Sequence, residues 1–170
     1  MPPVTPTTSP DLVPALASSW FGGGLSPEAV SRLASIASIR SVPADTELFH
    51  EGQVTEAMSI VLDGRVALRT LVPERGMVTI LTVEAGDIIG WSALVPPHRA
   101  TSVGIAIEPV TLVDLPGDKL RQLLRGDHPL AASVYPRVMQ AMGRRLAATR
   151  LQQLDLFARE EWNRAETRPW

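Results

Sequence analysis

The stretch Ser59–Arg69 reads SIVLDGRVALR, and it decides the fold class. Two short apolar runs flank Asp63-Gly64, a pair that tolerates positive φ and therefore favours a two-residue hairpin turn. Further runs of the same kind cover Met77–Val83, Ser102–Ile107 and Val110–Leu115. Strands this short, at this regular spacing, predict a β-sandwich or jelly roll.

Helix signals lie on both sides of this β region. Ser26 can cap a helix that begins at Pro27, because a serine hydroxyl accepts from free amides and proline is tolerated at the first helical position. Asp118 predicts the start of a second helix. Asp127 predicts the start of a longer one that runs past Phe157.

The 170 residues therefore divide into three parts. Residues 1–24 form a Pro/Thr/Ser-rich arm, which we expect to be flexible because proline-rich sequence has few donors for regular structure. Residues 25–128 form the β-roll with its N-terminal helix. Residues 129–170 form the long C-terminal helix and a tail.

Composition excludes several function classes. Apolar residues make up 45% of the chain and the formal net charge is −2, so no general field attracts nucleic acid or an anionic membrane. The chain has no cysteine, which excludes disulfides and thiolate metal sites. No run approaches the roughly 20 apolar residues that a membrane span needs. We expect a cytoplasmic protein without a membrane partner.

Catalytic motifs are also missing. The three histidines, His50, His98 and His128, form no close pair that predicts a metal site. The sequence has no Walker loop, no G-x-S-x-G elbow and no H-E-x-x-H. We expect a protein that is not an enzyme and that requires no cofactor or metal.

Three segments, in order, resemble the cyclic nucleotide-binding domain of the catabolite-activator (cAMP receptor) type. They are Leu48–Leu68, the loop Gly86–Leu94 with Arg99-Ala100-Thr101 after it, and the helical stretch Met142–Thr149. The loop resembles the family's phosphate-binding cassette, and the helical stretch resembles its dimerisation helix. The resemblance implies a mainly β fold with flanking helices, a β-jelly-roll (double-stranded β-helix) followed by a long dimerisation helix.

The resemblance also implies a site for a cyclic nucleotide. In it the phosphate lies on the Gly90–Ala93 backbone, Arg99 supplies the counter-charge and Thr149 meets the purine. A glycine lets backbone approach a ligand, and the guanidinium fork suits phosphate oxygens. The implied ligand-binding residues are Ile89, Gly90, Trp91, Ser92, Ala93, Arg99, Ala100, Thr101, Thr149 and Arg150.

Trp91 departs from the family pattern, which places a glutamate there to accept a hydrogen bond from the ribose 2′-hydroxyl. An indole donates one hydrogen bond and does not accept as a carboxylate does. Three outcomes stay open: the ring stacks on the ligand, it plugs the pocket, or it covers a different ligand.

Two hypotheses on function follow. The first is a stand-alone cyclic mononucleotide sensor, with cAMP or a related nucleotide as ligand, that acts on an unidentified protein effector. The second is a degenerate, nucleotide-independent dimeric scaffold or a binder of a different small ligand, with Trp91 filling the sugar site.

The long helix predicts how the chain assembles. Its two apolar stripes need two partners, so we expect a homodimer through residues 134–158. Only about a dozen residues follow Phe157, too few for a winged helix, so direct sequence-specific DNA binding is not expected.

Overall fold

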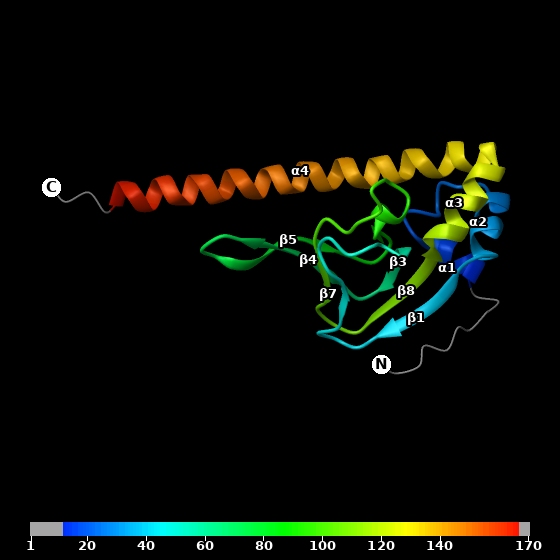
Figure 1. Ribbon diagram of the computed structural model, residues 1–170, viewed down its shortest axis with the longest axis horizontal. Coiled ribbons are helices and arrows are strands. Elements are labelled where there is room, and N and C mark those ends of the chain that lie inside the picture. Colours follow the sequence, from blue (N-terminus) through cyan, green and yellow to red (C-terminus); the bar gives the residue numbers. More distant parts are fainter. Residues whose placement is uncertain (1–11, 167–170) are drawn as a thin grey trace.

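The computed structural model describes residues 12–166, with side chains over residues 12–150, and consists of a β-roll flanked by helices (Figure 1). The helices are α1 (Leu12–Ser18), α2 (Pro27–Ala34), α3 (Gly117–Gly126) and α4 (His128–Glu166), and a 3₁₀ turn, η1, covers Trp91–Ala93. The strands are β1 (Ser38–Val42), β2 (Glu47–Phe49), β3 (Ala57–Asp63), β4 (Val66–Val72), β5 (Gly76–Val83), β6 (Ile88–Ile89), β7 (Val103–Ala106) and β8 (Val110–Pro116). The predicted fold class, mainly β with flanking helices and a long C-terminal helix, is confirmed.

The strands form two antiparallel sheets, ordered β1-β8-β3-β6 and β2-β7-β4-β5. The predicted strands on either side of Asp63-Gly64 are present, but they do not form a hairpin: β3 pairs with β8 and β6, whereas β4 pairs with β5 and β7. The turn carries the chain from one sheet to the other. Gly64 has a φ of +81°, and a Cβ there would lie 2.3 Å from the Pro109 carbonyl oxygen, so the turn requires glycine.

The central strands of one sheet, β3 and β8, are buried on both faces. Ile60 and Val113 belong to a core shared with the helices, while their neighbours Val61 and Leu112 belong to the core inside the roll. Successive strand residues point to opposite faces, so both β3 and β8 need continuous apolar sequence. This is why their sequences lack the simple polar alternation of a surface strand.

Residues 12–24 differ from the expected flexible arm. Leu12, Leu16 and Phe21 are buried in the core beneath α2 and α4, and Leu12–Ser18 is helical. The apolar residues in this segment outweigh its prolines, because burying each large side chain stabilises the fold by about 1.5–3 kcal/mol. Residues 1–11, the rest of the predicted arm, lie outside the described residues.

The helix starts agree with the sequence in two of three cases. The Ser26 side chain accepts a hydrogen bond from the Ala29 amide, and Asp127 accepts one from the Leu130 amide at 3.0 Å. Asp118 is not a cap, because it lies inside the first turn of α3.

Helix α4 runs along one side of the roll and extends past it (Figure 1). Within the predicted dimer segment 134–158, the buried residues Val134 and Val138 pack on this chain's own core. The predicted positions from 151 onward lie outside the described side chains. None of the helices in the described part of the chain combines the length and the hydropathy that a membrane crossing requires.

Candidate ligand-binding site

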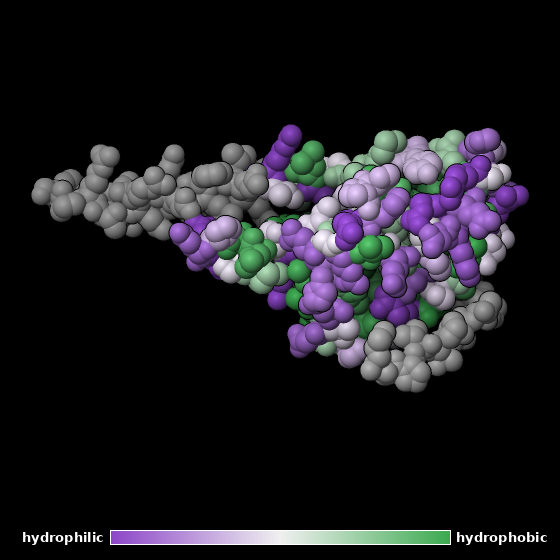
Figure 2. Space-filling view, in the orientation of Figure 1, coloured by the Kyte–Doolittle hydropathy of each residue, from purple (hydrophilic) through white to green (hydrophobic). Residues whose placement is uncertain are grey.

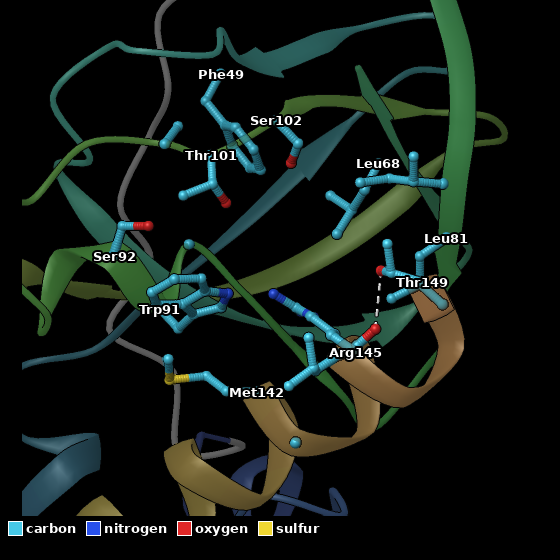
Figure 3. A pocket seen from close by; sticks show the side chains of 15 residues that line it. Phe49, Leu68, Leu81, Trp91, Ser92, Thr101, Ser102, Met142, Arg145 and Thr149 are labelled. Carbon is cyan, nitrogen blue, oxygen red and sulfur yellow. Dashed lines mark hydrogen bonds between the residues drawn. The ribbon is translucent and has the colours of Figure 1, made fainter. Parts of the chain in front are cut away.

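A cavity of about 390 Å³ lies between the roll and α4 (Figure 3). Three walls enclose it. The sheet wall comprises Phe49, Leu68, Ile80 and Leu81; the loop wall comprises Gly90, Trp91, Ser92, Ala100, Thr101 and Ser102; and the helix wall comprises Met142, Gly143, Arg145, Leu146 and Thr149. Arg145 is the one charged residue in this lining, so the cavity is an apolar space with a single cation and a few hydroxyls.

The loop wall is built on the turn η1. Gly90 has a φ of +68°, and a Cβ there would lie 2.5 Å from the Ala57 carbonyl oxygen, so glycine is needed both for conformation and for space. The Ala93 amide donates to the Gly90 carbonyl at 2.9 Å. The His98 ring contacts the Ser92 carbonyl at 3.1 Å. The turn is therefore fixed, and the Ala93 amide is used within it instead of facing an anion.

Arg99, the predicted counter-charge, lies outside the cavity. Its side chain is exposed, and its guanidinium donates to the Gly52 carbonyl at 2.7 Å. The loop pairs there with the segment around Val54 in extended conformation. Neighbouring residues of an extended chain point to opposite faces, so Ala100 lines the cavity and Arg99 points away from it.

The guanidinium in the cavity belongs to Arg145, which is not among the ligand-binding residues predicted from the sequence. Arg145 donates to the Ile88 carbonyl, while its Nε is buried and has no hydrogen-bond partner among the described residues. Burial lowers the pKa of Arg145 to about 10, against the opposing effect of the nearby Asp87. The spacing of Met142, Arg145 and Thr149 along one helix face was the available signal.

Arg144, the preceding residue, contacts Asp87 and Trp20 outside the cavity. Its guanidinium lies 3.6 Å from the centroid of the Trp20 ring, and it pairs with Asp87 at 3.2 Å. Arg137, two turns earlier, lies 5.5 Å from the same ring and donates to the Trp20 carbonyl. Helix α4 is thus attached to Asp87 and Ile88 by two adjacent arginines, only one of which enters the cavity.

The other predicted residues fall into two groups. Six line the cavity together: Gly90, Trp91, Ser92, Ala100, Thr101 and Thr149. Three do not: Ile89 is buried in the core of the roll, Ala93 is buried on the helix side, and Arg150 is exposed. Thr149 donates its hydroxyl to the Arg145 carbonyl at 2.9 Å, so its oxygen keeps lone pairs for a ligand.

Trp91 forms part of a wall and does not fill the space. Its side chain is half-buried, and the cavity beside it keeps a volume of about 390 Å³. In Figure 3 the indole nitrogen is turned toward the end of the Arg145 side chain. No group of three or more His, Cys, Asp or Glu side chains in the described residues could hold a metal ion.

The family model of the cyclic nucleotide-binding domain matches residues 39–127, which is more than half of the chain. The chain belongs to the cyclic nucleotide-binding domain family. The matched residues include the turn η1 and the loop that carries Arg99, whereas Arg145 lies beyond them. No curated protein matches the chain.

Solved structures of this family share the fold. A cyclic nucleotide-binding domain from Methylobacillus flagellatus is 26% identical with a TM-score of 0.73, over 85% of this chain and 82% of that one. The N-terminal domain of a transcriptional regulator from Streptomyces coelicolor is 24% identical with a TM-score of 0.63, over 82% and 94%. The catabolite activator protein of Thermus thermophilus is 24% identical with a TM-score of 0.66, over 82% and 63%. The last two show likeness of fold alone.

Proposed function

We propose that this chain is a regulatory module that senses a cyclic mononucleotide, cAMP or a close relative, and acts on a separate protein effector. The observation that carries this proposal is the cavity of about 390 Å³, whose apolar lining holds one enclosed guanidinium. A cyclic mononucleotide joins a monoanionic phosphodiester to an aromatic base. The cation suits the first and the apolar walls suit the second.

The position of Arg145 supports a sensing mechanism. Its guanidinium links α4 to β6 through the Ile88 carbonyl. A phosphate in the cavity competes for that guanidinium, so the ligand and β6 alternate as partners of one α4 side chain. Ligand affinity then differs between two arrangements of α4, which is the requirement for a switch.

The lining favours binding over catalysis. Among the fifteen described residues around the cavity there is no Asp, Glu, His or Cys, hence no side chain that suits proton transfer near neutral pH. We therefore propose a non-enzymatic module that needs no cofactor. Its cytoplasmic location stays a prediction, supported by the absence of cysteine from the sequence.

We also propose a homodimer through residues 134–158. On α4, Tyr135, Met139 and Leu146 are 41%, 61% and 56% exposed, and Figure 2 shows apolar surface along this helix. Leu146 also lines the cavity, so a second copy on this face would cover the cavity mouth.

Light scattering after size exclusion is expected to give a dimer for the wild type and a monomer for Met139→Glu. The matched control is Met77→Glu on β5, which should stay dimeric.

The test of ligand binding is isothermal titration with cAMP and cGMP, using a variant that fills the cavity. Gly143 lies on the cavity wall, and a Cβ there meets no atom within 4 Å, so Gly143→Phe introduces a ring without a backbone clash. Saturable heat is expected in the wild type and at least about a tenfold weaker affinity in Gly143→Phe. Gly126→Phe, with equally open space in α3, is the control. No heat from the wild type at millimolar ligand contradicts the proposal.

A second candidate function is the nucleotide-independent scaffold or the binder of a different ligand. Two observations favour it: Trp91 stands where the family has a glutamate, and Arg99 points away from the cavity. If this candidate holds, no cyclic nucleotide raises the melting temperature of the wild type, and Trp91→Glu gains cyclic-nucleotide binding. Tight binding by the wild type rules it out.

A further inference from the structure

Two hydrogen-bond donors converge in the cavity from different elements. The indole N–H of Trp91 comes from η1, the guanidinium of Arg145 comes from α4, and Figure 3 shows them turned toward one another. Within the described residues the indole N–H makes no hydrogen bond, and neither does Nε of Arg145. The loop wall and the helix wall of the cavity thus each present a hydrogen-bond donor toward the other.

No side chain in the lining complements these donors. The described residues around the cavity include no carboxylate and no carboxamide, and the nearby Asp87 is paired with Arg144 outside it. The lining hydroxyls are weak acceptors beside a cation, and that of Thr149 already donates to a backbone carbonyl. Buried polar groups normally find partners, and the buried Nε of Arg145 has none among the described residues, so the space beside the two donors suits a group rich in lone pairs.

We infer that Trp91 and Arg145 form a paired-donor site for the anionic group of an aromatic monoanion, a cyclic phosphodiester under the function proposed above. Trp91 is then a specificity-determining residue that recognises the anion and not the sugar. This inference rests on the proposed function only for the identity of the ligand. The donors select any monoanion whose aromatic body fits the apolar walls.

The chemistry of the pair gives it two properties. Hydrogen bonds from an indole and a guanidinium to an anion are charge-assisted, and enclosure by apolar walls strengthens them. The pair also offers no acceptor to a hydroxyl of the ligand. A sugar hydroxyl beside Trp91 therefore contributes little to the affinity, in contrast to a site with a carboxylate at that position.

The test compares affinities by isothermal titration with cAMP and 2′-deoxy-cAMP. Trp91→Phe keeps the aromatic wall but removes the N–H, and it should weaken cAMP binding by about tenfold. Arg145→Gln should weaken it at least as much, and Arg145→Lys should recover part of the loss because the charge remains. The wild type should bind both nucleotides within about twofold of each other.

Arg99→Gln is the matched control, since it removes a guanidinium outside the cavity, and its affinity for cAMP should stay within about twofold of that of the wild type. The inference is overturned if Trp91→Phe binds cAMP as the wild type does, or if the wild type prefers cAMP to the 2′-deoxy analogue by about tenfold. Either result leaves the proposed function standing.

A fluorescent aromatic sulfonate, 1-anilinonaphthalene-8-sulfonate, separates the two failures. If neither cyclic nucleotide binds, the proposed function fails. The donor pair is then tested by the binding of this sulfonate alone. Saturable binding by the wild type that weakens about tenfold in both Trp91→Phe and Arg145→Gln supports the pair. Equal affinity in all three proteins, or no saturable binding by the wild type, overturns it.

Discussion

The loop and the helix that supply two walls of the cavity each carry an arginine, and the two arginines have opposite surroundings. Arg99, on the loop, is exposed and bonded to the Gly52 carbonyl. Arg145, on α4, lines the cavity, and its buried Nε has no hydrogen-bond partner among the described residues. The positive charge available to a ligand therefore comes from the helix and not from the loop.

This difference determines how binding is linked to conformation. A ligand held by the loop could be bound without any demand on α4. A ligand held by Arg145 changes the contacts of α4 directly, and its affinity depends on where the helix lies. Under the proposed function, α4 is thus both a wall of the site and the element that responds to the ligand.

The largest effect is expected from breaking the loop wall at Gly90. Gly90→Ala places a Cβ 2.5 Å from the Ala57 carbonyl at a φ of +68°. Strain and clash together should destabilise the fold by about 3 kcal/mol and lower the melting temperature, followed by circular dichroism, by roughly 6–12 °C. Gly52→Ala, at a φ of +79° with no atom within 4 Å, should cost only about 1–2 kcal/mol. Equal losses in the two variants contradict the tight packing of η1.

A smaller loss is expected from detaching the helix wall at Trp20. Trp20→Ala removes the ring that contacts Arg137 and Arg144, and should cost about 2–3 kcal/mol in urea unfolding. Trp20→Phe keeps an aromatic face and should lose about half as much. Unchanged stability in Trp20→Ala would show that this contact does not hold α4.

A gain of stability is expected from Arg145→Met in the ligand-free chain. Burial lowers the pKa of Arg145 to about 10, so the folded state disfavours its charge, and removing that charge should stabilise by about 1 kcal/mol at pH 7. Above pH 10 the folded wild type releases a proton that the unfolded chain keeps, so its stability relative to Arg145→Met rises with pH.

The difference between the two unfolding free energies, measured in urea, should therefore shrink by about 1 kcal/mol between pH 7 and pH 11. Taking the difference removes the titration of the groups that both proteins share. A difference that stays constant or widens over this range contradicts the enclosure of Arg145.

The sequence was sufficient for the strands but not for their partners. Asp63-Gly64 predicted a turn with positive φ, which Gly64 adopts and Asp63 does not, and such a turn can close a hairpin or cross between sheets. Only the pairing of β3 with β8, which is far along the chain, decides between these. The helical segment around Leu16 was missed because its buried contacts are tertiary and the prolines beside it dominate the local pattern.

The position of the candidate cavity could be predicted from the sequence, but the arginine that supplies its positive charge could not. The loop from Gly90 to Thr101 does form one wall, as the resemblance implied. The side on which Arg99 lies depends on the pairing of its loop with Val54. Successive side chains of this loop point to opposite sides, but the sequence does not show which of them point into the cavity until that pairing is known. Arg144 and Arg145 are adjacent in sequence, and only the packing of α4 shows which one enters the cavity.

The most direct test is the response of cAMP binding to the two arginines measured side by side. Isothermal titration should show Arg145→Gln weakening cAMP by about tenfold or more, while Arg99→Gln stays within about twofold of the wild type. Circular dichroism melting of each variant confirms that both are folded. A tenfold loss in Arg99→Gln with unchanged binding in Arg145→Gln would contradict the account, since the counter-charge would then come from the loop.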